Sequence, residues 1–304
     1  MRAGAAGAAG EASARVVLRA TAAVSPRVAG ALAYRLFRRP FGRGRVRSGE
    51  RSAHLAASTD TLEVAGKRVV VYRWGDGAEP VLLAHGWQSR ASRFAPFVAG
   101  LRARGMTPIG FDAPGHGDSG GTGTTVLEYA EIARQLQDRH GDFRAVLAHS
   151  FGVLGAFQAL RSGVRADRVV AVGGVCDVEY LLDRFSAVLG LDDRVKALLR
   201  ARADARLLAP ETDIWRRFSA SYDAERLRVP ILVVHDEDDD TVAIEQGRRL
   251  AAAHPGRAEL FATRGLGHHR VLGDAAVVAE VLRFLDAAAP VVPIPTVPIP
   301  TVRP

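Results

Sequence analysis

The feature of this 304-residue chain that most constrains its fold is a regular alternation of short apolar runs and helical segments. The runs are enriched in β-branched residues, and several are apolar on both faces, as central parallel strands are. Strand, helix, strand repeated with short connections predicts an α/β fold with a mostly parallel central sheet and helices on both faces. After an antiparallel pair in LEVAGKRVVVYRWG, the expected strands are PVLLAHG, TPIGFDAPG, FRAVLAHS, RVVAVGGV, PILVVHDE and AELFATRG.

Length and cysteine usage indicate how such a chain is held together. A domain of this size buries about three quarters of its unfolded surface, so it needs neither a disulfide nor a structural metal. Cys176 is the only cysteine, and no spacing of Cys and His residues suggests a zinc site. We therefore expect one main domain in the cytoplasm, with no metal and no cofactor.

The net charge of +8 would suit a nucleic-acid-binding protein, but its distribution along the chain does not. Eleven arginines against Glu11 and Glu50 give residues 1–55 a charge of +9, so the other 249 residues carry −1. In a protein that binds nucleic acid in a groove, the excess positive charge would lie on the folded domain. We expect no nucleic-acid partner.

Residues 1–55 form a basic N-terminal arm that we expect to be helical or partly disordered. Its apolar runs are interrupted too often for a signal peptide or a membrane-spanning helix, by Arg15, Arg19, Pro26 and Arg27. One interpretation packs the arm on the body through Leu18, Val28, Leu32 and Leu36. The other is peripheral contact of a basic amphipathic helix with anionic lipid. We favour packing or partial disorder, because basic amphipathic patterns often arise by chance.

The opposite end of the chain is a proline-rich tail at residues 289–304, which contains VPIPT twice. Proline removes backbone donors and favours extended chain. We expect this tail to be disordered and outside the fold, which leaves residues 56–288 as the folded domain.

Ser150 stands where one predicted strand, FRAVLAH, passes directly into a predicted helix, VLGAFQAL. A strand, tight turn and helix around a serine is the context of a nucleophile elbow, which exposes the hydroxyl above the carboxyl ends of the strands. The alternative is that Ser150 only caps the helix, since serine is a favoured N-cap residue.

The loop LAHGWQSR, residues 83–90, follows the PVLLAHG strand and would meet Ser150 at the same edge of the sheet. Acyl transfer needs two backbone N–H groups aimed at the developing oxyanion, and Trp87 and Phe151 are the candidates. We expect His85 to fix this loop through a hydrogen bond rather than to act as a base.

Two further loops offer the acid and the base that a nucleophilic serine requires. In VVHDEDDDTV, the carboxylates of Asp236, Asp238, Asp239 and Asp240 are all candidates. In TRGLGHHRVLGD, the two glycines that precede His268 indicate an unusual backbone path and favour it over an ordinary exposed histidine.

Serine, acid and histidine in this chain order, each after its own predicted strand, resemble the α/β-hydrolases over roughly residues 60–288. Three short motifs carry the resemblance. The family's oxyanion loop is similar to HGW at 85–87, its loop after the next strand to FDAPGHGDSGG at 111–121, and its elbow to HSFG at 149–152. Ala148 replaces the usual first glycine of the elbow. The family's H-G-x-x-D-x-x-V pattern selects Asp239, with Asp236 in place of its glycine, whereas relatives whose acid follows the preceding strand would use Asp177.

The resemblance implies a serine hydrolase with Ser150 as nucleophile, His268 as base and Asp239 as its partner. It implies cleavage of a carboxylic ester of a small or medium hydrophobic substrate through an acyl-enzyme. A thioesterase, lactonase, carbon–carbon bond hydrolase or acyltransferase would use the same residues. A non-catalytic ligand-binding member of the fold is the alternative from another class.

The segment at residues 177–227 is much longer than a simple crossover between strands needs. Its helical spacing of apolar residues predicts a small helical cap over the site, the alternative being an ordinary pair of packed helices. Trp87 and Phe151, with Phe185 from this segment, predict a substrate-binding pocket for a small-molecule acyl group. Arginines of the cap could bind a substrate carboxylate, or pair with nearby acids.

Overall fold

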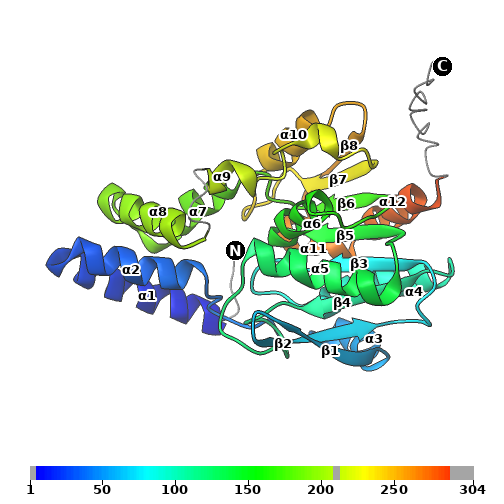
Figure 1. The fold of residues 1–304 in the computed structure, drawn as a ribbon, viewed down its shortest axis with the longest axis horizontal. Helices are drawn as coiled ribbons and strands as arrows, with labels where there is room; N and C mark the ends of the chain where they lie inside the picture. The colour runs from blue at the N-terminus through cyan, green and yellow to red at the C-terminus, as the bar shows by residue number, and fades with distance from the viewer. Residues whose placement is uncertain (1–4, 208–212, 288–304) are drawn as a thin grey trace, which may run out of the picture.

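The chain folds around one eight-stranded sheet in the order β1-β2-β4-β3-β5-β6-β7-β8. The computed structural model describes residues 5–207 and 213–287 (Figure 1). β1 and β2 are antiparallel, β2 runs antiparallel to β4, and the remaining neighbours are parallel, which confirms the predicted fold class. The strands are β1 (Ser58–Val64), β2 (Lys67–Arg73), β3 (Pro80–Ala84), β4 (Thr107–Asp112), β5 (Ala145–His149), β6 (Val169–Val172), β7 (Ile231–Asp236) and β8 (Ala258–Thr263).

The central strands are apolar on both faces because each face is covered by helices. In β5, Val146 and Ala148 belong to one hydrophobic cluster and Ala145 and Leu147 to the other, as the alternation of side chains requires. The first cluster includes α5 (Val126–His140), α6 (Phe151–Arg161) and α10 (Ile244–Ala253), and the second includes α4 (Ala95–Arg102) and α12 (Ala275–Asp286). The short helices α3 (Arg51–Leu55) and α11 (Gly267–Arg270) lie in connecting segments.

The insertion between β6 and β7 is helical. It contains α7 (Val178–Leu189), α8 (Asp193–Leu207) and α9 (Ile214–Arg217). Leu182, Leu199 and Trp215 are buried in the same cluster as the helices of the first sheet face. These helices therefore extend the core beyond the sheet.

The N-terminal arm contains two helices, α1 (Ala5–Val24) and α2 (Pro26–Phe37), separated by Ser25. The Ser25 hydroxyl accepts a hydrogen bond from the Val28 N–H, and Pro26 occupies the first helical position, as a helix start favours. α2 packs on α8, and the pair lies beside α1 at one edge of the molecule (Figure 1).

The face through which the arm packs agrees with the expected one except at Val28. Leu18 of α1 is buried, but Val28 is 56% exposed, and Leu32 and Leu36 are only partly buried. The buried residues of α2 are small, since a Cβ added at Gly30 would lie 2.6 Å from the Leu198 Cβ of α8. The helices thus approach more closely than a leucine face would allow, so the prediction for Val28 was wrong.

Within residues 5–207 and 213–287, no helix is long and apolar enough to cross a membrane. The proline-rich tail at 289–304 lies outside the described residues. Peripheral contact between the arm and lipid stays a prediction.

We expect Gly155→Ala to lower the free energy of unfolding by about 1–3 kcal/mol, because overpacking strains a close-packed core. The added Cβ would lie 2.8 Å from ring carbons of Tyr129, where α6 meets α5. Gly49→Ala is the matched control, since its Cβ would meet nothing within 4 Å. Urea unfolding of both variants measures the difference, and equal stabilities would contradict the close packing of α5 and α6.

Candidate active site

Ser150 lies at the junction of β5 and α6 with a backbone conformation that L-residues rarely adopt, φ 56° and ψ −123°. Its N–H donates to the Val172 carbonyl over 3.0 Å, and its side chain makes no capping hydrogen bond to α6. The helix-cap alternative is therefore wrong. Backbone strain of this kind persists only where the surroundings enforce it, and it marks functional sites.

The turn at Ser150 leaves room only for small residues beside it. A Cβ at Gly86 would lie 2.7 Å from the Ser150 Cβ, and a Cβ at Gly152 would lie 2.7 Å from the His85 carbonyl oxygen. Ala148 is accommodated because its partners on the neighbouring strands are also alanines, Ala84 on β3 and Ala171 on β6.

His268 lies between Ser150 and Asp239. Its Nε2 is 3.0 Å from the Ser150 Oγ, and its Nδ1 is 2.7 Å from the Asp239 Oδ2. An ionised carboxylate can only accept, so Nδ1 carries the proton and Nε2 accepts from the serine hydroxyl. The other Asp239 oxygen accepts the N–H groups of Thr241 and Val242, which fixes the carboxylate.

The competing acids have other partners. Asp177 pairs with Arg249 over 2.6 Å, and Asp238 accepts the Gly265 N–H. Of the acids considered from the sequence, the structure brings Asp239 to His268.

Asp236 performs a role that the sequence reasoning missed. It is buried, and its carboxylate accepts the N–H groups of Leu266 and Gly267 and the Thr263 hydroxyl. Burial alone would raise the pKa of Asp236, but these hydrogen bonds outweigh it and lower the pKa. Asp236 thereby joins its own loop to the loop that carries His268, where Gly265 has a positive φ of 80°.

His149 supports the same histidine from the other side. Its Nε2 donates to the His268 carbonyl over 3.0 Å, and the two rings lie 4.7 Å apart between centroids. Burial, together with the neighbouring His268, holds the pKa of His149 well below its usual range. A neutral ring at this position places no positive charge beside His268.

The loop after β3 is fixed by His85, as the sequence predicted. The His85 Nε2 accepts the Ala113 N–H, its Nδ1 donates to the Gly86 carbonyl, and burial lowers its pKa to about 4. Among the described residues, neither the Trp87 N–H nor the Phe151 N–H has an acceptor. The Trp87 and Phe151 rings meet edge-on, with centroids 5.4 Å apart.

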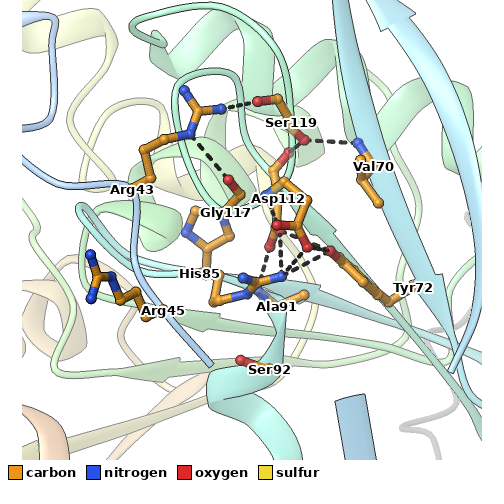
Figure 2. A network of polar contacts seen from close by, with 12 residues as sticks. Arg43, Arg45, Val70, Tyr72, His85, Ala91, Ser92, Asp112, Gly117 and Ser119 are labelled. Atoms are coloured by element: carbon orange, nitrogen blue, oxygen red, sulfur yellow. Dashed lines mark hydrogen bonds and ion pairs between the residues drawn. The ribbon is translucent and has the colours of Figure 1, made fainter. Parts of the chain in front are cut away.

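A buried polar network fixes the loop after β4 (Figure 2). The Asp112 carboxylate accepts the Ala91 N–H and the Tyr72 hydroxyl, and pairs with Arg90 over 3.1 Å. Ser119 links the Asp112 carbonyl to the Val70 N–H. The sequence marked this loop only through its resemblance, because the partners come from three separate segments.

A cavity of about 270 Å³ opens above Ser150. Trp87, Phe151 and Phe185 line it, as do Phe37 and Phe41 of the arm, which the sequence reasoning did not place near the site. No group of three or more His, Cys, Asp or Glu side chains within the described residues could hold a metal ion.

The comparisons with known proteins agree with this geometry. A model of the alpha/beta hydrolase family matches residues 81–281. The chain belongs to the alpha/beta hydrolase family. A curated relative, the dihydrolipoyllysine-residue acetyltransferase component of the acetoin cleaving system of Cupriavidus necator, is 33% identical over 136 residues, which is 44% of this chain and 35% of that protein. The chain thus spans about a third of that relative's length.

Solved structures share the fold at low sequence identity. An esterase of Pyrococcus furiosus superposes with a TM-score of 0.60 and 18% identity, over 81% of this chain and 98% of that one. An esterase of a Rhodococcus species gives a TM-score of 0.56 and 21% identity, over 76% and 98%. At this identity the likeness concerns the fold.

We expect Asp236→Asn to lower the free energy of unfolding at pH 7 by about 1–3 kcal/mol, because an amide nitrogen would face backbone donors. The folded-state pKa of Asp236 lies below the unfolded value of about 3.9, so its stabilisation is present above that pH and is lost as the pH falls through the lowered pKa. Urea unfolding from pH 7 to pH 3 should therefore show the difference from the wild type shrinking only at the acid end.

The matched control is Asp238→Asn, whose exposed carboxylate accepts one backbone N–H from the same loop. Asp238→Asn should lower the free energy of unfolding at pH 7 by less than half as much as Asp236→Asn. Equal costs, or a difference that does not depend on pH, would contradict the role given to Asp236.

Proposed function

We propose that this protein is a cytoplasmic serine hydrolase that cleaves a carboxylic ester of a small or medium hydrophobic substrate through an acyl-enzyme. The observation that carries the proposal is the continuous chain of hydrogen bonds from Ser150 through His268 to Asp239, with distances of 3.0 and 2.7 Å. Nucleophile, base and orienting acid in this geometry are the requirement for acyl transfer by serine.

The first half of the reaction acylates the serine. The Ser150 Oγ attacks the ester carbonyl carbon while His268 Nε2 takes the hydroxyl proton. The oxyanion accepts hydrogen bonds from the Trp87 and Phe151 N–H groups, which have no other described acceptor. Collapse of the tetrahedral intermediate breaks the bond to the alcohol, which leaves with the proton from His268.

The second half releases the acid. His268 removes a proton from water as the water oxygen attacks the acyl carbonyl, and the same N–H groups hold the second oxyanion. The intermediate expels the Ser150 oxygen, which recovers its proton from His268. Asp239 stays ionised throughout and stabilises the imidazolium in both halves.

The cavity supports a hydrophobic acyl substrate of limited size. Its walls near the serine are aromatic, with Trp87, Phe151 and Phe185, and its volume of about 270 Å³ lies at the lower end of ligand pockets. Thioester, lactone and carbon–carbon bond cleavage would use the same residues, and acyl transfer would replace water by another acceptor. A non-catalytic receptor would not need Ser150 in a strained backbone or His268 in its aligned tautomer.

Labelling with a fluorophosphonate probe, followed by peptide mass analysis, tests the nucleophile. We expect an adduct on Ser150 in the wild type and none in Ser150→Ala. His268→Ala should lower the turnover of a nitrophenyl ester by about 10⁶-fold, and Asp239→Asn by about 10⁴-fold, as in other serine hydrolases with one triad member removed.

Two neighbouring residues provide matched controls. His269 is exposed beside His268, and Asp177 is the acid that pairs with Arg249. His269→Ala and Asp177→Asn should retain most of the activity. A folded wild type that neither labels at Ser150 nor cleaves any ester or thioester would exclude the proposed function, and a larger loss from Asp177→Asn than from Asp239→Asn would reassign the acid.

A further inference from the structure

The N-terminal hairpin of α1 and α2 supplies one wall of the cavity above Ser150, although it precedes the residues that the family model matches. Phe37, Arg38 and Phe41 line the cavity from this side. The Phe37 ring meets the Phe185 ring of α7 edge-on, with centroids 5.2 Å apart. Arm and cap are therefore in direct contact at the substrate cavity.

The hairpin and the segment after it are fastened to the loops that surround the site. The Thr124 N–H donates to the Arg38 carbonyl over 3.3 Å, and Arg15 donates to the Val188 carbonyl of α7 over 2.6 Å. Arg43 donates to the carbonyls of Gly117 and Ser119 in the loop after β4 (Figure 2). These contacts fix the arm to α7 and to the loops that surround the cavity, so the arm is not a separate tail.

Arg38 is the unusual member of this wall. Its Nη1 donates to the Tyr34 hydroxyl over 3.3 Å, while its buried Nε has no partner. It pairs with no carboxylate among the described residues, whereas Arg200 of the cap pairs with Glu179. A half-buried cation loses solvation, and contact with the Tyr34 hydroxyl and ring offsets this only in part, whereas a ligand carboxylate would supply the missing negative charge.

We propose that the hairpin completes the substrate pocket and that Arg38 binds a carboxylate at the far end of the acyl chain. The proposal rests on the proposed hydrolase function and names its substrate class, half-esters of dicarboxylic acids. Guanidinium groups pair well with carboxylates. Glu11 lines the same cavity as Arg38, Arg39 and Arg184, and its negative charge offsets part of their positive charge. A singly charged carboxylate therefore suits this wall better than a phosphate dianion.

Two ester series test the proposal, 4-nitrophenyl esters of linear fatty acids and the corresponding half-esters of dicarboxylic acids. We expect the wild type to show a higher kcat/KM for the best half-ester than for the fatty-acid ester of equal length. Arg38→Gln should lower kcat/KM for the half-ester by about tenfold or more, mainly through KM, and leave the fatty-acid ester within about twofold. Arg35→Gln, on the exposed side of the same helix, should change neither.

Binding without turnover separates this proposal from the proposed function. Calorimetry on Ser150→Ala should show octanedioate binding more tightly than octanoate, and Arg38→Gln in that background should abolish the preference. Equal binding of the two acids, or equal effects of the Arg38 and Arg35 variants, would overturn the carboxylate site even if Ser150 labels normally. A clear preference in a protein that cleaves no ester would retain the site and reject the hydrolase function.

A second, independent observation concerns the outer face of the hairpin. Six large apolar side chains are exposed among the described residues, and four lie here: Val16 at 68%, Val17 at 52%, Val24 at 87% and Val28 at 56%. Exposed arginines flank them, Arg19 on α1 and Arg27 at the start of α2. The net charge of +9 over residues 1–55 complements a negative surface.

We infer that this face docks on an anionic lipid bilayer. Valines would enter the boundary between headgroups and acyl chains while the arginines meet the lipid phosphates, as in other interfacial helices. The same hairpin lines the substrate cavity, so docking would bring the cavity close to the bilayer.

Sedimentation of the full chain with vesicles tests the docking surface. We expect binding to vesicles that contain phosphatidylglycerol, little binding to pure phosphatidylcholine, and release at high salt. Replacing Val16, Val17 and Val24 together by serine should weaken binding by about tenfold or more. The control replaces Leu55 and Leu260, which are exposed elsewhere, and should bind like the wild type. No sedimentation of the wild type, or equal binding by both variants, would overturn the inference.

Discussion

The tight turn at Ser150 is the constraint on which the rest of the site depends. The turn forces a positive φ on a residue with a side chain and brings Gly86 and Gly152 into contact with their neighbours. In return, the hydroxyl emerges at the carboxyl ends of the parallel strands, where the loops after β3, β6, β7 and β8 converge. A larger residue at either glycine would move the serine away from His268.

Buried polar groups then fix those loops, because apolar packing alone does not orient a loop. His85 and Asp112 fix the loop after β3, and Asp236 joins the loops that carry Asp239 and His268. Each group is fully buried and partnered by backbone N–H or carbonyl groups. A hydrogen bond in this environment gives direction as well as stability, so the distances around His268 depend on residues that do not touch the serine.

The cover of the site is built from two parts of the chain that are far apart in sequence. The insertion at residues 177–227 supplies Phe185, and the N-terminal hairpin supplies Phe37 and Arg38. α2 can lie close to α8 because small residues face the contact, with Gly30 against Leu198. Arginines of the arm are therefore present both at the cavity beside Ser150 and on the outer face of α1.

The sequence by itself determined the sheet and the order of its functional loops. Alternating apolar runs predicted the strands, and the pattern around Ser150 predicted the direct passage from β5 into α6. Local pattern also predicted that His85 would hold its loop, because these features depend on residues close together in the chain. The fold, and the placement of the candidate site at one edge of the sheet, could be predicted this far because periodicity and turn chemistry are local properties, while the roles of the site residues stay a proposal.

Only the tertiary structure decided which acid faces His268 and what the arm does. Asp177 and Asp239 both follow strands. Only the structure shows that Asp177 pairs with Arg249, whereas Asp239 pairs with His268. The apolar pattern of the arm predicted the contacts of Leu18, Leu32 and Leu36 but wrongly included Val28, because α2 approaches α8 closely with Gly30 against Leu198. Contacts between separate segments of the chain depend on shape, which a single sequence does not display.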